Sequence, residues 1–511
     1  FKMTVIPGLA TEEATKAYAD RIWKDNPQIS PNNWRVLEGL TVSKIGFGTY
    51  RINGDAGQEE ALKKSLREGL NLIDTSSNYM AGEAEKTVGK VLAELIHDGE
   101  IKREEVVLVT KGGYAQQQDL LYLHDNPMDD VVEMGPELAH CIHPDFLDMQ
   151  LERSLERLGV EAVDVFMLHN PEYYLMWAKD NGVSAEDAQA EYAKRLLKAF
   201  VYLEDKAKEG KIGFYGVSSN TFVTPKDDPT HTDLAVMFEQ AQEAAKQAWG
   251  RRKRPMFRCI QLPMNLLEPN AVRLKNTSAK IIDGEEEVST LELASRMHLG
   301  VLVNRPLNAF PDTGTAYRLA EGVNDNTAEL DSAMAAIQAT EKQLAELLGG
   351  WPSVDDEPLL SFAMVGDKIK EGIINSVHFD HLKNAFIWPQ VAYVNHSIET
   401  LKRAGKADAQ QLSQLQHDYI EQAKALLEAL HTYARSKDTA HNAGLVKELK
   451  QRLPENWHDQ PLARIALNSV ASTPGVTSVL CGLRREEYVT DALELMQKED
   501  FADASKILGA K

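Results

Sequence analysis

Short apolar runs recur along the chain, and most of them are followed by a stretch with helical periodicity. The runs are near-continuously apolar rather than alternating, which is typical of strands that are covered on both faces. Between them, Glu60–Glu68 places Leu62 and Leu66 on one helical face and ends at Gly69. Eight parallel strands with intervening helices predict a (β/α)8 TIM barrel, an α/β fold. The predicted strands are Lys44–Thr49, Leu70–Thr75, Val106–Gly112, Val163–His169, Ile212–Ser218, Phe257–Leu262, Val301–Pro306 and Thr477–Gly482.

Some parts of the chain lie outside this repeat. Arg35–Lys44 is predicted to be a hairpin that turns at Glu38-Gly39 and caps the barrel floor. Between Pro306 and Thr477 lie roughly 170 residues, where a barrel connection needs roughly 25–40. The predicted divisions are an N-terminal extension in residues 1–34, barrel strands one to seven in 35–309, a helical insertion in 310–460, and strand eight with the C-terminal helices in 461–511.

The predicted insertion is largely helical. Two sets of apolar residues recur there at helical spacing, and the second contains no Gly or Pro, so we expect it to pair with a neighbouring helix. An insertion after a barrel strand emerges on the C-terminal face, where barrel active sites lie. It is therefore expected to be a lid over the site, a contact for a homo-oligomer or another partner, or a peripheral decoration. The sets are Leu330, Met334, Ile337, Leu344 and Leu348, and Leu412, Leu415, Tyr419, Ala423, Leu426 and Leu430.

Charge and composition narrow the class of protein. The chain carries 56 Lys and Arg against 77 Asp and Glu, a net charge of −21, which argues against nucleic acid or an anionic membrane as the main partner. Cys141, Cys259 and Cys481 are too few and too scattered for a disulfide scaffold or a metal cluster. No apolar run approaches the roughly 20 residues that span a bilayer, and no signal peptide is visible. We therefore expect a cytoplasmic protein without a metal site.

Ionisable residues stand at the predicted C-terminal ends of three adjacent strands. Asp74 ends strand two and Tyr79 follows in the loop, Lys111 ends strand three, and His169 ends strand four. Each is commonplace alone, since an Asp before Thr-Ser is often a helix cap, a strand-end Lys usually reaches solvent, and a strand-end His is more often structural. Together they form a proton-transfer set, because a nearby ammonium lowers the pKa of a phenol, a carboxylate holds the ammonium charged, and an imidazole orients a carbonyl oxygen.

These residues stand in motifs that resemble the aldo-keto reductase family. The family's pattern of Asp, a Thr/Ser-rich loop, Tyr, Gly and Glu appears as Asp74-Thr-Ser-Ser-Asn-Tyr79-Met-Ala-Gly82-Glu-Ala-Glu85. Its strand-three Lys matches Lys111 in VTKGG, its strand-four His matches His169 in LHNP, and its leading Gly-Phe-Gly-Thr matches Gly46–Thr49. The resemblance implies hydride transfer between a carbonyl and an alcohol, with Tyr79 as general acid or base, Lys111 and His169 assisting, and Asp74 orienting Lys111. It covers Leu37–Asn308 and Leu462–Met496, but not the insertion.

The resemblance also implies a nicotinamide dinucleotide, NADP(H) rather than NAD(H), bound without a Rossmann domain. No G-x-G-x-x-G stands between a strand and a helix here. Polar groups after strand five and in strand six would hold the nicotinamide carboxamide, and the doubled Ser in YGVSSN leaves the second contact open between Ser219 and Asn220. The candidate cofactor contacts are Gly48, Thr49, Tyr50, Asp74, Ser218, Ser219, Asn220, Gln261, Asn304, Arg305, Pro306, Leu307, Gly482, Arg484, Tyr488 and Asp491.

The sequence departs from the family's pattern in two places. Many members have an aromatic residue two positions before the Pro of strand seven, where this chain has Asn304, so stacking on the nicotinamide must be looser or supplied elsewhere; Arg305 is expected to reach the pyrophosphate. After strand eight, Arg484 or Arg485 is expected to offer a fork to a 2′-phosphate, with an ordinary charged helix start as the alternative. Asp491 is a candidate for holding the adenine amino group.

The substrate is poorly specified, because loops determine it. The loop after strand three, Gly113–Pro144, and the segment after strand four carry aromatic and His residues that either wall a pocket for an aromatic or carbohydrate substrate or pack against the insertion. These residues are Tyr114, Tyr122, His124, His140, Tyr173, Tyr174 and Trp177.

Other classes of function are less well supported. A barrel of this family can also be a cofactor-sensing or scaffolding subunit that binds a partner through its helical insertion. A hydrolase of the same fold lacks an evident carboxylate pair or metal triad in this sequence, and no Cys stands in a recognisable nucleophile motif.

Overall fold

The computed structural model describes residues 5–251, 253–310, 316–320, 326–354, 356–405 and 408–509. The chain divides into two compact units, Phe1–Pro306 with Arg464–Gly509, and Leu307–Ala463 with Ala510–Lys511. In the described part of the chain, no helix is long and apolar enough to cross a membrane.

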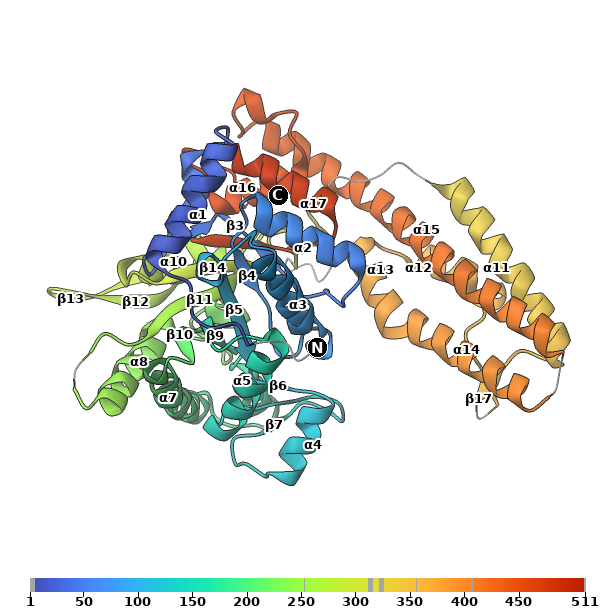
Figure 1. The fold of residues 1–511 in the computed structure, drawn as a ribbon, viewed down its shortest axis with the longest axis horizontal. Helices are drawn as coiled ribbons and strands as arrows, with labels where there is room; N and C mark the ends of the chain where they lie inside the picture. Colours follow the sequence, from blue (N-terminus) through green and yellow to red (C-terminus); the bar gives the residue numbers. More distant parts are fainter. Residues whose placement is uncertain are drawn as a thin grey trace. The chain divides into compact units, whose positions relative to one another are not determined.

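The first unit contains a closed barrel of eight parallel strands surrounded by helices (Figure 1). All eight predicted strands are confirmed, and the barrel closes where the last strand pairs with the first. The register sets the polar strand ends level with one another: Ser218 pairs with His169 on one side and with Gln261 on the other. In order around the barrel the strands are β3 Ile45–Gly48, β4 Leu72–Asp74, β5 Val107–Gly112, β9 Val163–His169, β10 Ile212–Ser218, β11 Phe257–Pro263, β14 Gly300–Asn304 and β19 Ser478–Cys481.

The predicted hairpin closes the floor of the barrel. Strands β1 Trp34–Leu37 and β2 Leu40–Ser43 pair antiparallel around Glu38 and Gly39, whose φ angles of 50° and 86° suit a tight hairpin turn. Leu37, Leu40 and Val42 join the apolar core that fills the barrel interior. A Cβ on Gly300 would lie 2.0 Å from Leu37, so the hairpin needs glycine at the start of β14.

Helices cover the outside of the barrel, and their burial follows the expected apolar faces. Helix α2 ends at Gly69 as predicted, with φ 125° there. The N-terminal extension contains a helix that the sequence did not indicate, α1 Glu12–Asp25. The other helices of this layer are α2 Ala56–Glu68, α3 Glu83–His97, α5 Pro144–Leu158, α7 Ala185–Glu209, α8 Leu234–Trp249, α10 Thr290–Arg296, α16 Leu462–Ala471 and α17 Glu486–Met496.

Three connections of the barrel carry small elements of their own. The loop after β5 holds β6 Tyr114–Ala115, α4 Gln118–Asp125, β7 Val132–Glu133 and β8 Ala139–His140, with a three-stranded sheet and a small apolar cluster. Helix α6 Tyr173–Asp180 follows β9. After β11 come α9 Asn270–Arg273 and the hairpin β12 Lys275–Ile281 with β13 Gly284–Ser289.

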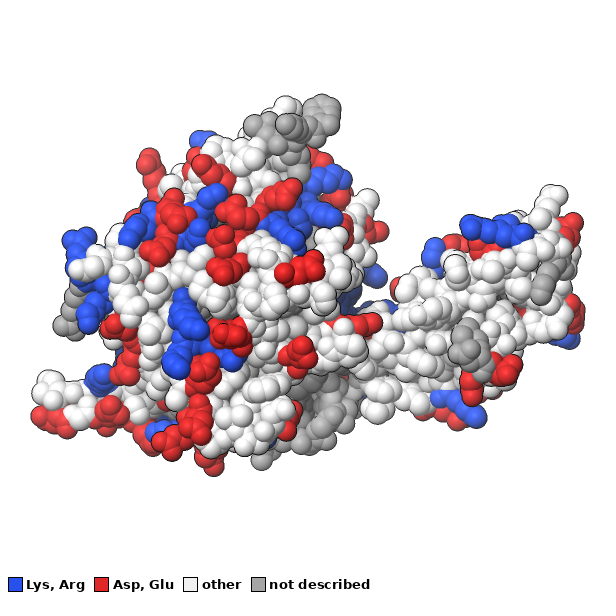
Figure 2. Space-filling view, turned by 90° about the horizontal axis from the view of Figure 1, so that it is seen from below, with Lys and Arg blue, Asp and Glu red and all other residues white. Residues whose placement is uncertain are grey.

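The second unit is mostly helical and has a core of its own. Both predicted apolar sets lie on helices, in α11 Thr327–Leu348 and α15 Ala409–Lys450, and these two helices pack together. Helices α12 Phe362–Gly372, α13 Ser376–Leu382 and α14 Trp388–Arg403 complete the unit, with a π-helical turn at Lys383–Ile387. Two short hairpins pair β15 Asn308–Ala309 with β16 Tyr317–Arg318, and β17 Ser353–Val354 with β18 Glu357–Pro358. Figure 2 shows one face of the molecule, on which acidic and basic side chains are intermixed.

Candidate active site

The ends of β4 and β5 bring three of the predicted residues into direct contact. Lys111, on β5, is completely buried, and its Nζ donates to Asp74 Oδ2 at 2.8 Å and to the Thr75 carbonyl at 2.8 Å. The same Nζ lies 3.2 Å from the hydroxyl of Tyr79. Asp74 is only 3% exposed. A buried ion pair is thus placed against a phenol at the C-terminal rim.

A chain of hydrogen bonds continues from Asp74 across the rim. Gln261 Nε2 donates to Asp74 Oδ1 at 2.9 Å. Gln261 Oε1 accepts from Ser218 Oγ and from Asn304 Nδ2, both at 3.2 Å. Residues from β4, β5, β10, β11 and β14 are therefore joined in one polar network. Sequence reasoning listed Asn304 as a candidate cofactor contact at the position where many relatives have an aromatic residue, and the structure places its amide on Gln261.

The phenol of Tyr79 is held by rings as well as by Lys111. Tyr79 begins a short turn, η2 Tyr79–Gly82, and is 8% exposed. Its ring makes edge contacts with Tyr50 at 5.2 Å and with His169 at 5.8 Å between centroids. Tyr50 is 65% exposed, so it covers Tyr79 from the solvent side.

The pKa of Tyr79 shifts in the direction opposite to the expected one. Burial raises the pKa of Tyr79, and the attraction of Lys111 opposes the rise only in part. The sequence predicted a lowered value; burial reverses the sign, because it disfavours the phenolate. Burial also lowers the pKa of Lys111, but attraction to Asp74 and Tyr79, with their hydrogen bonds, outweighs burial and leaves that pKa raised. Lys111 is therefore a permanent cation beside a protonated phenol.

His169 ends β9 and faces Tyr79 as a neutral ring. Its Nδ1 lies 3.0 Å from Ser76 Oγ, in the loop between Asp74 and Tyr79. Burial, then the positive charge of Lys111, hold the pKa of His169 well below its ordinary value. The His169 carbonyl accepts from His140 Nε2 at 2.7 Å, which fixes the position of a second buried ring, whose pKa burial lowers to about 4.

Aromatic residues of two loops form a wall around His169. Tyr114 makes an edge contact with His169 at 4.7 Å, and its hydroxyl accepts from Asn170 Nδ2 at 2.7 Å. Tyr173 stacks on His140 at 5.4 Å. Gly113 is required here, because a Cβ at φ 140° would lie 2.8 Å from His140 Nε2 and 3.0 Å from the His169 carbonyl.

The remaining aromatic candidates lie elsewhere in the barrel unit. Tyr122 packs against Phe146, and His124 is 86% exposed beside Asp125. Tyr174 and Trp177 stack on each other, with the guanidinium of Arg195 4.0 Å from the Tyr174 ring centre. Only Tyr114, His140 and Tyr173 of the seven predicted residues meet at His169.

Of the candidate cofactor residues, those on the first strand and after β10 lie along the same rim. Gly48 ends β3, and Thr49 donates to the Asp74 carbonyl through both N–H and hydroxyl, each at 3.0 Å. Ser219 uses its hydroxyl to cap the turn η4 Asn220–Val223 and to contact Thr232. Asn220 is exposed at the start of that turn. Of the two alternatives for the second carboxamide contact, the Ser219 hydroxyl already makes hydrogen bonds within the protein, and Asn220 is exposed.

One buried acid was missed by sequence reasoning. Glu172 is 1% exposed, its Oε1 accepts from the Asn220 N–H at 2.8 Å, and its Oε2 is buried without a hydrogen-bond partner among the described residues. Burial raises the pKa of Glu172 to about 7. It stands three residues beyond His169, in an otherwise ordinary loop sequence, so only the fold could single it out.

The candidates beyond β14 and β19 are more dispersed. Arg305 follows β14 with φ 53°, and burial lowers its pKa; Pro306 is buried beside it. Leu307 begins the second unit. After β19, Gly482 is exposed and Arg484 lines an open depression of about 480 Å³ together with the N-terminus of α2.

The end of that segment lies on α17. Arg485 stacks over Tyr488 at 6.0 Å and pairs with Glu487 at 3.6 Å. Asp491 is 72% exposed in its side chain and lies 3.8 Å from Arg464. These groups surround an accessible surface rather than the buried Tyr79–Lys111 centre.

Taken together, the buried centre can donate and accept a proton at one phenol, next to a fixed positive charge. A thiol nucleophile finds no support, because all three cysteines are buried and burial raises the pKa of Cys141 to about 12.

Part of the chain is similar in sequence to known proteins. Residues 44–248 match the model of the aldo/keto reductase family. An NADH-specific methylglyoxal reductase of Escherichia coli is 31% identical over 140 residues, which are 25% of this chain and 39% of that protein. An NAD(P)H-dependent D-xylose reductase of Scheffersomyces stipitis is 27% identical over 197 residues, 36% of this chain and 51% of that protein. The chain therefore spans about half or less of the length of these curated relatives.

Solved structures overlap more loosely. An aldo-keto reductase from Bacillus halodurans in its holo form has a TM-score of 0.44 and 15% identity, over 94% of this chain and 97% of that one. A glycerol dehydrogenase from Gluconobacter oxydans has a TM-score of 0.44 and 16% identity, over 93% of each chain.

Proposed function

We propose that this chain, whose residues 44–248 match the model of the aldo/keto reductase family, is a member of that family and an NAD(P)(H)-dependent oxidoreductase that interconverts a carbonyl and an alcohol. Aldehydes, ketones and sugars are the substrate classes. The observation that carries the proposal is the buried contact of Tyr79 with Lys111, 3.2 Å apart and continued through Asp74 to Gln261. The curated relatives are named as reductases of methylglyoxal and D-xylose, which supports a carbonyl substrate.

Each residue of the centre has a role that its surroundings favour. Tyr79 would give its proton to the carbonyl oxygen in reduction and take it back in oxidation. Lys111 would stabilise the phenolate that remains, since an adjacent cation favours the charged form. Asp74 would keep Lys111 charged and aimed. His169, as a neutral ring, would donate from Nε2 to the carbonyl oxygen and orient it.

The polar rim fits the nicotinamide group. When bound, the cofactor supplies or accepts the hydride. Asn304 Oδ1, Thr75 Oγ1 and Ser77 Oγ are buried without hydrogen-bond partners among the described residues, and buried polar atoms of that kind call for a partner. Asn304 Oδ1 is an acceptor suited to a carboxamide N–H. Ser218, Ser219 or Asn220, and Gln261 would hold the same group.

Other residues of the chain would contact the pyrophosphate and the adenosine part of the dinucleotide. Gly48, Thr49 and Tyr50 would line the rim, and Arg305, with Pro306 and Leu307, would approach the pyrophosphate. Arg484 beside the depression after β19 favours NADP(H), with Tyr488 and Asp491 near the adenine. Relatives named for NADH and for NAD(P)H both match, so NAD(H) is kept as the alternative.

A second candidate function rests on the second unit. Residues 307–463 form a compact unit with its own apolar core, far larger than a barrel connection needs. This favours a cofactor-sensing or scaffolding subunit that binds a partner through the insertion. Turnover with a panel of aldehydes, ketones and sugars separates the two, since a sensor binds the cofactor without turnover. A role as lid, assembly into homo-oligomers through residues 310–460, and a cytoplasmic location remain predictions.

The direct test is Tyr79→Phe, which removes only the hydroxyl. Turnover should fall by about 10²–10⁴-fold, the usual contribution of general acid–base catalysis, while the dissociation constant of the reduced cofactor changes by less than about twofold. Tyr122→Phe, whose ring packs against Phe146, is the matched control and should retain activity. Equal activity of wild type and Tyr79→Phe on the same carbonyls would remove the basis of the proposal.

A further inference from the structure

The turn that follows Tyr79 has an uncommon backbone. Met80 has φ 49° and ψ 41°, Ala81 has φ 55° and ψ 35°, and Gly82 has φ 90°. Two successive non-glycine residues in the left-handed region are unfavourable and persist only where their surroundings enforce them. Both Met80 and Ala81 are exposed, so their own packing does not hold the turn. Contacts at its two ends therefore add to the backbone hydrogen bonds within the turn.

The first end is Tyr79 itself. Its ring lies between Tyr50 and His169, and its hydroxyl meets Lys111. The loop before it is tied to β5, since the Ser77 N–H donates to the Lys111 carbonyl at 3.1 Å. These contacts set where the phenol lies. Beyond Tyr79, the Ala81 N–H donates to the Asn78 carbonyl at 3.3 Å, and the Glu83 N–H donates to the Met80 and Tyr79 carbonyls.

The second end is Gly82, which begins helix α3. Gly82 is buried, and a Cβ there would lie 2.9 Å from Cδ and 3.0 Å from Nε of Arg157 on helix α5. The side chain of Arg157 therefore lies directly against the left-handed turn. Glu85 and Ser154 set the position of the Arg157 side chain. Its Nε donates to Glu85 Oε2 at 2.6 Å, and its Nη2 donates to Ser154 Oγ at 3.2 Å.

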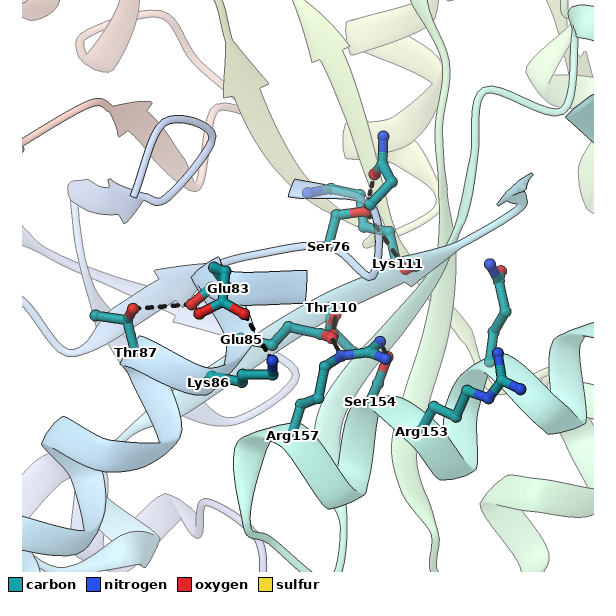
Figure 3. Close-up of polar contacts among 12 residues, drawn as sticks. Ser76, Glu83, Glu85, Lys86, Thr87, Thr110, Lys111, Arg153, Ser154 and Arg157 are labelled. Atoms are coloured by element: carbon teal, nitrogen blue, oxygen red, sulfur yellow. Dashed lines mark hydrogen bonds and ion pairs between the residues drawn. The ribbon is translucent and has the colours of Figure 1, made fainter. Parts of the chain in front are cut away.

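Glu85 connects this end of the turn to the strand that carries Lys111. Glu85 is completely buried on α3, and its Oε1 accepts from Thr110 Oγ1 at 2.6 Å. Thr110 precedes Lys111 on β5, and the two side chains point to opposite faces of the strand. Figure 3 shows Glu85 between Thr110 and Arg157 below β5, with Lys111 and Ser76 on its other side.

Docking of the helix alone does not explain this carboxylate. Gly89, one turn further along α3, already brings the helix against α5, because a Cβ there would lie 2.5 Å from the Leu158 carbonyl. Glu85 instead fixes two things at once, the strand position next to Lys111 and the Arg157 side chain that supports the Tyr79 turn.

We propose that Glu85, acting through Arg157 and Thr110, is a positioning residue that holds Tyr79 at its hydrogen-bonding distance from Lys111. This proposal rests on the proposed function for its catalytic consequence, but not for its structural one. It assigns a role to the Gly82–Glu85 half of the sequence motif, whose residues take no part in the proton transfer.

The test compares Glu85→Gln with Glu83→Gln, the same substitution two residues earlier on α3. Glu83 is exposed and pairs with Lys86 (Figure 3). Amide hydrogen exchange of residues 79–82 is measured first, in the full chain without substrate. Glu85→Gln should speed exchange there by about tenfold or more, and Glu83→Gln should not.

Kinetics then test the consequence. Glu85→Gln should lower kcat by about 10- to 100-fold, since small misplacement of a catalytic group is costly, with KM for the cofactor within about twofold. The pH at which activity is half lost on the alkaline side should also move, because Tyr79 no longer meets Lys111 at a fixed distance. A merely structural role would leave that pH unchanged.

The outcomes separate this proposal from the proposed function. Faster exchange in Glu85→Gln, with no carbonyl turnover even in the wild type, would keep the positioning role and remove the function. Wild-type exchange and wild-type kcat in Glu85→Gln would overturn the positioning role and leave the function intact. If Glu85→Gln does not fold, Thr110→Val, which removes one hydroxyl and leaves the Glu85–Arg157 pair, decides by the same two measurements.

Discussion

Two lysines of the barrel are buried almost completely, one at each end. Lys111 at the rim is 0% exposed, and Lys44 at the floor, just before β3, is 1% exposed. Both have an Asp partner, at 2.8 Å for Asp74 and 3.3 Å for Asp500. Burial lowers the pKa of both ammonium groups, yet the pKa of Lys111 ends raised while that of Lys44 ends lowered.

The difference comes from the groups that surround each ammonium. Lys111 Nζ has a carboxylate, a carbonyl and a phenol as neighbours. Lys44 Nζ contacts the Lys498 carbonyl at 3.0 Å and the carboxylate of Asp500, which also pairs with Arg35. The positive charge of Arg35 repels Lys44 and lowers its pKa. A buried cation keeps its charge only when enough acceptors compensate for lost water. The rim therefore holds a fixed charge beside a proton donor, while the floor holds a bond between the hairpin and the C-terminal segment.

The largest expected effect comes from removing the rim lysine. Lys111→Met keeps the length of the side chain and removes its charge. Tyr79 would lose the cation that stabilises its phenolate, so we expect turnover per folded molecule to fall by about 10²–10⁴-fold. Steady-state kinetics on one aldehyde, normalised to the folded fraction from near-UV circular dichroism, measures this.

Lys44→Met is the matched control at the floor. It should cost roughly 1–3 kcal/mol of unfolding free energy, because the Lys498 carbonyl loses its donor while Asp500 keeps Arg35. Turnover per folded molecule should stay within about twofold of the wild type. An equal loss of turnover in both variants would mean that the two lysines do not differ as their surroundings indicate.

The regularity of the apolar pattern in each segment explains how much of the fold could be predicted from the sequence. The eight barrel strands are continuous apolar runs, the floor hairpin has a turn signal at its centre, and the two long insertion helices have apolar residues at helical spacing. These patterns can be recognised without tertiary information. Helix α1 and the sheet of β6, β7 and β8 were not predicted. Strands of two residues are too short to show a period, and their pairing depends on partners distant in the sequence.

The candidate site was predictable at its centre and less so around it. Asp74, Lys111 and His169 stand at strand ends and Tyr79 in the loop after the first of them, so parallel topology predicts that they meet at one rim. The hydrogen bond from Asn304 to Gln261 and the orphaned oxygen of Glu172 depend on side-chain directions that a sequence does not contain. The pKa of Tyr79 was expected to fall because the cation was visible in sequence, whereas the burial that outweighs it was not.

Glu172 is the acidic counterpart of the two buried lysines. It is a buried acid near the rim with no lysine or arginine in ion-pair contact among the described residues. Its pKa in the folded protein is about 7, against an ordinary value of 4.5. Between those values the folded protein keeps a proton that the unfolded chain has lost. Stability should therefore fall as pH rises from about 4.5 to 7, by up to roughly 3 kcal/mol, and change no further above that range.

Denaturant unfolding at several pH values, in wild type and Glu172→Gln, measures this effect. The difference in unfolding free energy between the two proteins should shift in favour of Glu172→Gln as pH rises through that window, since all other groups are shared. The neighbouring groups that face this carboxyl are Ser219, Tyr192 and Tyr114, none of which gains or loses a proton in that range. A difference that does not vary with pH would mean that Glu172 ionises normally.

The smallest effect concerns the neutral partner at the rim, Ser76. For His169 to donate from Nε2 to a carbonyl, its Nδ1 must be an acceptor. The Ser76 hydroxyl, 3.0 Å away, must then turn its proton from Asn78 Oδ1, at 2.7 Å, to that nitrogen. Ser76→Ala removes that hydrogen bond without touching the charges of Lys111 and Asp74. We expect kcat/KM to fall by about tenfold, equivalent to about 1.4 kcal/mol of transition-state stabilisation.

A second buried serine provides the control for this substitution. Ser65, on α2, donates to the Ala61 carbonyl at 2.9 Å, so Ser65→Ala removes a buried hydroxyl away from the rim and should leave kcat/KM unchanged. If Ser76→Ala also leaves it unchanged, His169 does not need a fixed tautomer, and its contribution reduces to the ring contact with Tyr79. The chemistry of the rim would then rest on the contact between Tyr79 and Lys111.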